Sequence, residues 1–90
     1  MAMMAVKIKI MPSSPTTDLE EIRRRAEVII RESNGKNLQI SEEPIAFGLK
    51  ALILFFAWPE EKTLESLEQK LSKIDNVQSE EVVDMRRAFG

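Results

Sequence analysis

The chain contains neither cysteine nor histidine among its 90 residues. The absence of cysteine excludes disulfides, thiol nucleophiles and thiolate metal sites. The absence of histidine removes the usual general base, the commonest zinc ligand and the side chain that changes charge near neutral pH. Any catalysis would have to rest on carboxylates, lysine, arginine or hydroxyl groups, so the sequence favours a binding function over an enzymatic one.

An excess of one charge and long apolar runs are also missing. The 13 basic and 15 acidic residues give a net charge of −2, which leaves no overall electrostatic footprint for nucleic acid. The longest apolar run, Ala51 to Trp58, is far shorter than the roughly 20 residues that span a membrane. No signal peptide is evident. We therefore expect a cytoplasmic protein that needs no cofactor and binds neither a membrane nor nucleic acid directly.

The first half of the chain is predicted to form a strand, a helix and a second strand. The first strand has apolar residues at every second position: Val6, Ile8 and Ile10. We expect Thr17 to cap the helix, because Glu20 follows at capping-box spacing. Asn34-Gly35 should end it. The second strand is expected over about 36–42. One helix face carries an apolar stripe: Leu19, Ile22, Ala26, Ile29 and Ile30.

The second half repeats this order. Leu49 to Trp58 is apolar on both faces, which is typical of a central strand, although a short apolar run could also be a buried helix. Thr63 is expected to cap a second helix, and a fourth strand is expected from Val77 to Met85, followed by a tail from Arg86 to Gly90. The second helix also has an apolar stripe: Leu64, Leu67, Leu71 and Ile74.

The βαββαβ order predicts an α+β, ferredoxin-like fold over residues 1–90, a length that suffices for a single domain. Four antiparallel strands would form one sheet, with both helices on one face and the first and third strands at the centre. The other face either exposes aromatic and apolar surface, which usually marks an interaction site, or is covered by long side chains from the edge strands.

Several functions of ferredoxin-like domains have local requirements that can be checked. The loop from Met11 to Pro15 has neither the paired cysteines of a metallochaperone nor the glycine and arginine of an acylphosphatase phosphate cradle. An RNA-recognition motif needs aromatic residues on both central strands. The first strand has none, although Phe55 or Phe56 could stack a base. The acidic pairs are interpreted as solvated surface charges: Glu20-Glu21, Glu42-Glu43, Glu60-Glu61 and Glu80-Glu81.

Two segments stand out from this pattern. Connections between strands are normally polar, yet the segment from Pro44 to Lys50 has apolar residues at its centre, among them Phe47. Phe47 could fold back to close the core or form an apolar wedge at the end of the sheet, and Gly48 permits a positive φ angle. Near the C-terminus, Arg86-Arg87 could bind phosphate or carboxylate groups, or only protect the sheet edge.

The string Pro44-Ile45-Ala46-Phe47-Gly48-Leu49-Lys50 is similar to the Pro-Ile-x-Phe-Gly-[Ile/Leu]-Lys signature of the exchange domain of the elongation factor 1-beta family. The opening segment Val6 to Pro12, followed by Pro15 and Asp18-Leu19, resembles the archaeal branch of that family. The ending, Val77 to Ser79 and then Val82 to Arg87, resembles the closing strand of the family. The three segments occur in order, so the resemblance covers nearly the whole chain.

This resemblance implies a guanine-nucleotide exchange factor that binds the GTPase elongation factor 1-alpha, both GDP-bound and nucleotide-free. In eukaryotic members the motif phenylalanine docks on the partner and a penultimate lysine reaches the Mg²⁺ site of the GTPase. By position these roles carry over to Phe47 and to Arg87, where arginine replaces lysine and Arg86 could share the role. The expected partner-binding residues are Pro44, Phe47, Gly48, Lys50, Arg86 and Arg87.

Two other functions are compatible with the predicted fold. One is a small ligand-sensing or oligomerising domain that pairs through the open face of its sheet. The other is a single-stranded RNA binder, whose affinity would depend strongly on salt.

Overall fold

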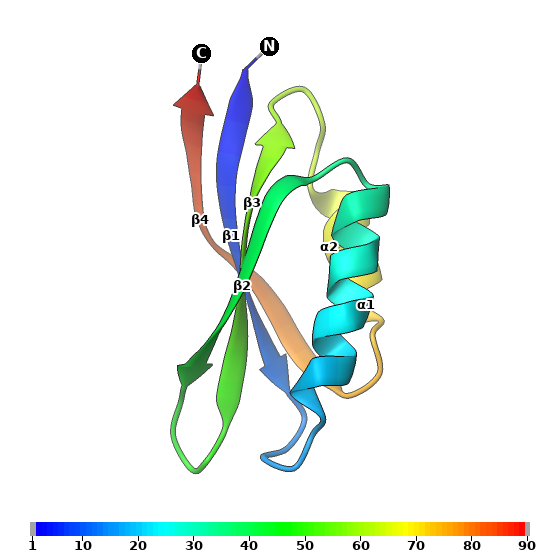
Figure 1. The fold of residues 1–90 in the computed structure, drawn as a ribbon, viewed down its shortest axis with the longest axis vertical. Coiled ribbons are helices and arrows are strands. Elements are labelled where there is room, and N and C mark those ends of the chain that lie inside the picture. Colours follow the sequence, from blue (N-terminus) through cyan, green and yellow to red (C-terminus); the bar gives the residue numbers. More distant parts are fainter. Residues whose placement is uncertain (1, 90) are drawn as a thin grey trace.

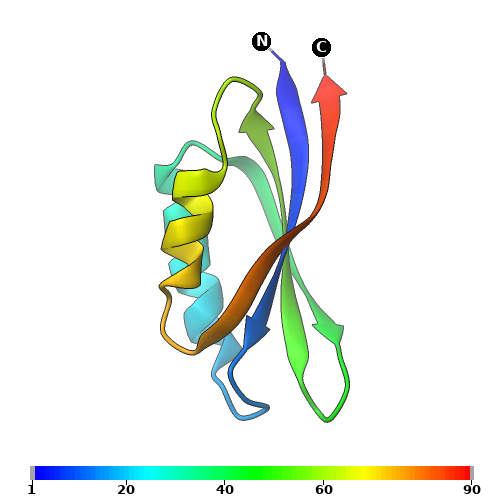
Figure 2. The ribbon, with the colours of Figure 1, turned by 180° about the vertical axis from the view of Figure 1, so that it is seen from behind.

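The computed structural model describes the backbone of residues 2–89 and the side chains up to residue 87. The elements along the chain are β1 (Met3–Pro12), α1 (Leu19–Glu32), β2 (Lys36–Pro44), β3 (Lys50–Pro59), α2 (Glu65–Ser72) and β4 (Val77–Phe89). All strand pairs are antiparallel, in the order β2-β3-β1-β4. Both helices pack against the same face of this sheet (Figures 1 and 2). The predicted ferredoxin-like fold, with the first and third strands at the centre, is confirmed.

The hydrophobic core fills the space between the sheet and the helices. Alternation along β1 and β3 places every second residue on the covered face, where Ile8 lies opposite Leu54. Both predicted helix stripes face this layer, and their central residues are buried. The largest fully buried side chains are Phe56, Ile8, Ile10, Ile22, Ile30, Leu52, Leu54, Leu67, Leu71 and Val6.

Both predicted helix caps are wrong by one position. The N-cap of α1 is Asp18, whose Oδ1 accepts hydrogen bonds from the backbone N–H groups of Glu20 (3.0 Å) and Glu21 (3.4 Å). A carboxylate at this position satisfies helix donors that have no partner within the helix. Thr17 instead closes the preceding loop, because its Oγ1 accepts from the backbone N–H of Ser14.

Among the described residues, no side chain caps the start of the second helix. Leu64 is at its N-cap position and already has helical backbone angles (φ −87°, ψ −9°). Thr63 therefore lies one position before the N-cap residue. The Leu64 side chain is buried in the core, so packing rather than capping decides how the chain enters α2.

The bounds of three strands also differ from the prediction. β2 continues to Pro44, and β3 runs from Lys50 to Pro59. The predicted end of the fourth strand at Met85 is wrong, because β4 continues to Phe89. β1 begins at Met3 and so offers backbone partners along this extra length. Arg86 and Arg87 thus lie within β4 and not in a tail after it, whereas Gly90 lies outside the described residues.

Within the described chain, no other element covers the face of the sheet opposite the helices (Figure 2). Phe55 is 44% exposed there and Val83 is 43% exposed. Val83 is the extra residue of a β-bulge between β1 and β4. Lys9 and Glu43, on strands either side of β3, form an ion pair (3.6 Å) on the same face. Exposed apolar surface and long charged side chains therefore share this face.

Candidate partner-binding site

The Pro44–Lys50 segment forms the tight turn of the β2–β3 hairpin. The backbone N–H of Ile45 donates to the carbonyl of Leu49 (2.7 Å), and the N–H of Leu49 donates to the carbonyl of Ala46 (3.2 Å). Phe47 and Gly48 lie at the tip and both have positive φ angles, 60° and 76°. Two consecutive positive φ angles are typical of the turn that matches the twist of a hairpin.

Phe47 is unfavourably placed in two respects. Its side chain is 94% exposed, the largest exposure among the bulky apolar residues of the described chain. Its left-handed backbone, unlike that of Gly48, costs about 1–3 kcal/mol. Folding alone gains nothing from an aromatic ring at this position. Of the two predicted placements, the structure has the apolar wedge and not the ring closing the core.

The hairpin tip lies beside the loop between β1 and α1. The Cβ of Pro15 comes within 3.9 Å of the place where a Cβ on Gly48 would sit. A hollow of about 330 Å³ separates the two loops, and Gly48 and Lys50 both line it. Lys50 also faces Glu42 across the hairpin (3.9 Å). Pro44 ends the edge strand β2, where its missing N–H disturbs no inner ladder.

Arg86 and Arg87 lie on opposite faces of β4. Arg86 is opposite Ala5 of β1, and its Nε forms an ion pair with Asp84 (3.0 Å) on the same strand. Arg87 is opposite Met4, whose side chain packs against the core, so Arg87 projects towards the helix side. Its Nη2 forms an ion pair with Glu60, in the turn that follows β3.

The predicted residues therefore form two groups at the two ends of the molecule. The hairpin group of Pro44, Phe47, Gly48 and Lys50 lies at one end of the sheet, and the arginine group of Arg86 and Arg87 lies at the other (Figure 1). The longest dimension of the molecule is 41 Å. The structure separates the two groups by most of the sheet's length, and within the arginine group it places the two side chains on opposite faces of β4.

Two acidic residues that sequence reasoning treated as solvated surface charges have specific surroundings. Glu60 is the ion-pair partner of Arg87, 27 positions away in the sequence, so no local pattern could have revealed the contact. Glu80 lies on β4 opposite Ile10, and its Oε2 is buried without a hydrogen-bond partner among the described residues. Its pKa is raised from the ordinary 4.5 to about 7, first by burial, then by the charge of Glu68 and a hydrogen bond with that side chain.

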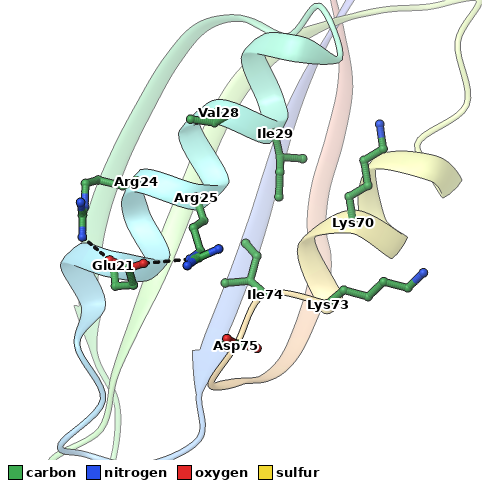
Figure 3. A pocket seen from close by; sticks show the side chains of 9 residues that line it. All are labelled: Glu21, Arg24, Arg25, Val28, Ile29, Lys70, Lys73, Ile74 and Asp75. Carbon is green, nitrogen blue, oxygen red and sulfur yellow. Dashed lines mark hydrogen bonds and ion pairs between the residues drawn. The ribbon is translucent and has the colours of Figure 1, made fainter.

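A groove of about 620 Å³ runs between α1 and α2 on the opposite side of the helices from the sheet (Figure 3). Its apolar floor includes Ile29 and Ile74, and Val28 adds exposed apolar surface at the rim. Arg24 and Arg25 on the rim both pair with the carboxylate of Glu21.

Within residues 2–89, no group of three or more carboxylates lies close enough together to hold a metal ion. Among the same residues, neither helix has the length and apolar character needed to cross a membrane.

Comparison with known proteins assigns the chain to one family. The model of the EF-1 guanine nucleotide exchange domain matches residues 5–88. Elongation factor 1-beta of Methanosarcina barkeri is 43% identical over 84 residues, which cover 92% of this chain and 94% of the relative. Elongation factor 1-beta of Methanothermobacter thermautotrophicus is 42% identical over 81 residues, which cover 89% and 90%. The resemblance predicted from the sequence is confirmed, and the chain belongs to the family of EF-1 guanine nucleotide exchange domains.

Proposed function

We propose that this chain, a guanine-nucleotide exchange factor by family, releases GDP from elongation factor 1-alpha by binding the GTPase and without covalent chemistry of its own. Residues 1–90 would act as one exchange domain in the cytoplasm, where translation takes place. The absence of histidine and cysteine is compatible with this role, because exchange requires no nucleophile and no general base.

The physical requirement is a difference in affinity. A GTPase holds GDP through backbone amides, a lysine and a Mg²⁺ ion at the phosphates. A factor that binds the nucleotide-free GTPase more tightly than the GDP-bound one weakens the hold on GDP by the same factor. A cation introduced near the phosphates and the Mg²⁺ ligands would produce such a difference, and Arg87, with Arg86 beside it, is the candidate group.

The exposure and left-handed backbone of Phe47 are the observation that carries the proposal. An almost fully exposed aromatic ring on a left-handed backbone stabilises nothing within the described chain, and strained positions of this kind cluster at functional sites. Burial of such a ring against a partner gives a large part of the binding energy in many interfaces. The rigid hairpin would present the ring in the orientation that it has in the free protein.

The separation of the two groups adds a geometric condition. If Phe47 and the arginines both contact the GTPase, one partner molecule must reach both ends of the sheet. We therefore propose that the hairpin end anchors the complex, while the arginine end acts on the nucleotide site. The first contact would set affinity and the second would set the rate of release.

The test is GDP release from the cognate GTPase, loaded with fluorescent GDP and chased with excess unlabelled GDP. We expect the unmodified chain to accelerate release, and Phe47→Ala to raise the concentration needed for half-maximal acceleration by about tenfold or more. Arg87→Ala should instead lower the maximal rate. Point variants are preferable to deletion of Arg86–Gly90, because that deletion would remove strand pairs with β1.

Phe55→Ala is the matched control, since it removes a partly exposed phenylalanine from the open face of the sheet. Its melting curve must first show that it folds. Equal losses in the Phe47 and Phe55 variants would contradict a specific role for the hairpin. No acceleration by the unmodified chain would refute the proposed function itself.

A further inference from the structure

The turn between β3 and α2 is fixed to three other parts of the fold. The backbone N–H of Glu60 donates to the carbonyl of Ala2 (3.2 Å), at the start of β1. The indole N–H of Trp58 donates to the carbonyl of Lys62 (3.0 Å), and Trp58 itself is only 3% exposed. The Lys62 ammonium donates to the carbonyl of Ser33 (2.7 Å), just after α1, and lies 4.9 Å from the Trp58 ring centroid.

These contacts hold the backbone of Glu60 in place relative to β1, β3 and α1. The side chain of Glu60 is 35% exposed, and its carboxylate meets the guanidinium of Arg87 at the end of the sheet. A flexible arginine side chain is thus tied to a turn that is itself rigid. By contrast, the partner of Arg86 is Asp84 on the same strand, so that ion pair fixes nothing outside β4.

The ion pair leaves most of the arginine available. It engages Nη2, and no other acceptor among the described residues meets Nη1 or Nε. The Arg87 side chain remains 63% exposed. Because a guanidinium has five N–H donors in a fixed fork, Arg87 can keep its contact with Glu60 while it binds an anionic group of a partner.

We propose that Glu60 is a positioning residue for nucleotide exchange: its carboxylate holds the Arg87 guanidinium at the end of the sheet, oriented towards the anionic nucleotide site of the GTPase. This inference rests on the proposed role of Arg87. Without Glu60, the long arginine side chain would have to be ordered during each encounter, and the ordering would slow the step in which the cation acts.

The experiment compares Glu60→Ala with Glu61→Ala in the GDP-release assay, using the full chain. Glu61 is the adjacent exposed carboxylate and forms no ion pair among the described residues. We expect Glu60→Ala to lower the maximal exchange rate about two- to fivefold, the range for an exposed ion pair, without changing the half-saturating concentration. Glu60→Gln keeps a hydrogen-bond acceptor and should recover part of the loss. Glu61→Ala should have no effect.

The Arg87→Ala background separates positioning from a general structural role. Adding Glu60→Ala there should change nothing, because the guanidinium that Glu60 holds is already absent. An equal loss in both backgrounds, no loss in either, or faster exchange by Glu60→Ala would overturn the inference. Unchanged exchange by Arg87→Ala alone would refute both the inference and the proposed role of Arg87, while exchange by the unmodified chain would stand.

A second readout does not depend on exchange. Nitrogen-15 relaxation of the Arg87 Nε–H group should show a restricted side chain in the unmodified protein and in Glu61→Ala. The same group should become mobile in Glu60→Ala. Equal mobility in all three proteins would overturn the inference whatever the exchange rates are.

Discussion

Replacing Glu80 by glutamine should stabilise the protein at pH 8 and leave its stability nearly unchanged at pH 4. Glu80 lies on the covered face of β4, where α2 and its Glu68 pack against the strand. Two carboxylates thus share a partly buried site, and one Glu80 oxygen has no hydrogen-bond partner among the described residues. A glutamine has nearly the shape of the protonated glutamic acid and can donate a hydrogen bond to Glu68.

The direction of this pH effect on stability follows from the raised pKa of Glu80. Since the pKa of Glu80 is about 7 in the folded protein and 4.5 ordinarily, the folded state binds the proton more tightly than the unfolded state. The stability from this proton is complete below pH 4.5 and is lost as the pH rises through 7. The full difference corresponds to about 3 kcal/mol. Because the side chain is only partly buried, we expect a loss of about 1–2 kcal/mol.

The assay is urea unfolding followed by circular dichroism at pH 4, 5, 6, 7 and 8. At pH 8, Glu80→Gln should exceed the unmodified protein by about 1–2 kcal/mol in unfolding free energy, and the gain should vanish by pH 4. Glu81→Gln is the matched control, because Glu81 follows directly and is exposed. A gain that is equal in both variants, or that persists at pH 4, would refute the assignment to Glu80.

Two further predictions concern glycine and backbone geometry. Phe47→Gly should raise the unfolding free energy by about 1 kcal/mol, because it removes the left-handed strain. GDP release should be as slow as with Phe47→Ala, and a lower unfolding free energy would contradict the strain. Gly35→Ala should lower the unfolding free energy by about 1–3 kcal/mol, because the new Cβ would lie 2.4 Å from Cγ2 of Ile30. Thermal melting tests this prediction, and an unchanged melting temperature would show that Ile30 moves freely.

The fold was predictable because its signals are repeated and local. Alternation in the first strand, the two apolar helix stripes and the continuous apolar third strand each follow from periodicity, and all three agree on one layer of core. Helix caps were less predictable. Thr17 and Asp18 are adjacent residues with the same capping chemistry, and only the backbone angles decide which of them caps α1.

The candidate site was predictable only in part. The exposure of Phe47 could be suspected from an apolar residue in a turn, and Gly48 indicated the turn itself. The ion-pair partner of Arg87 could not be predicted from the sequence, because Glu60 reaches Arg87 through the packing of the β3–α2 turn against β1. The separation of the two groups also depends on tertiary structure, since strand order and register determine at which end of the sheet each group lies.

The central strands also determine the distance between the two ends of the sheet. β3 has ten residues and joins the two ends of the sheet directly, so at about 3.3 Å per residue it spans about 30 Å. If the hairpin group and the arginine group both contact the GTPase, as proposed, the molecule binds as a bivalent ligand across this rigid spacer. Once one group is bound, the other is held at a high effective concentration near its own target. Two individually weak contacts can then give firm binding, but only to a surface that presents both targets at that spacing.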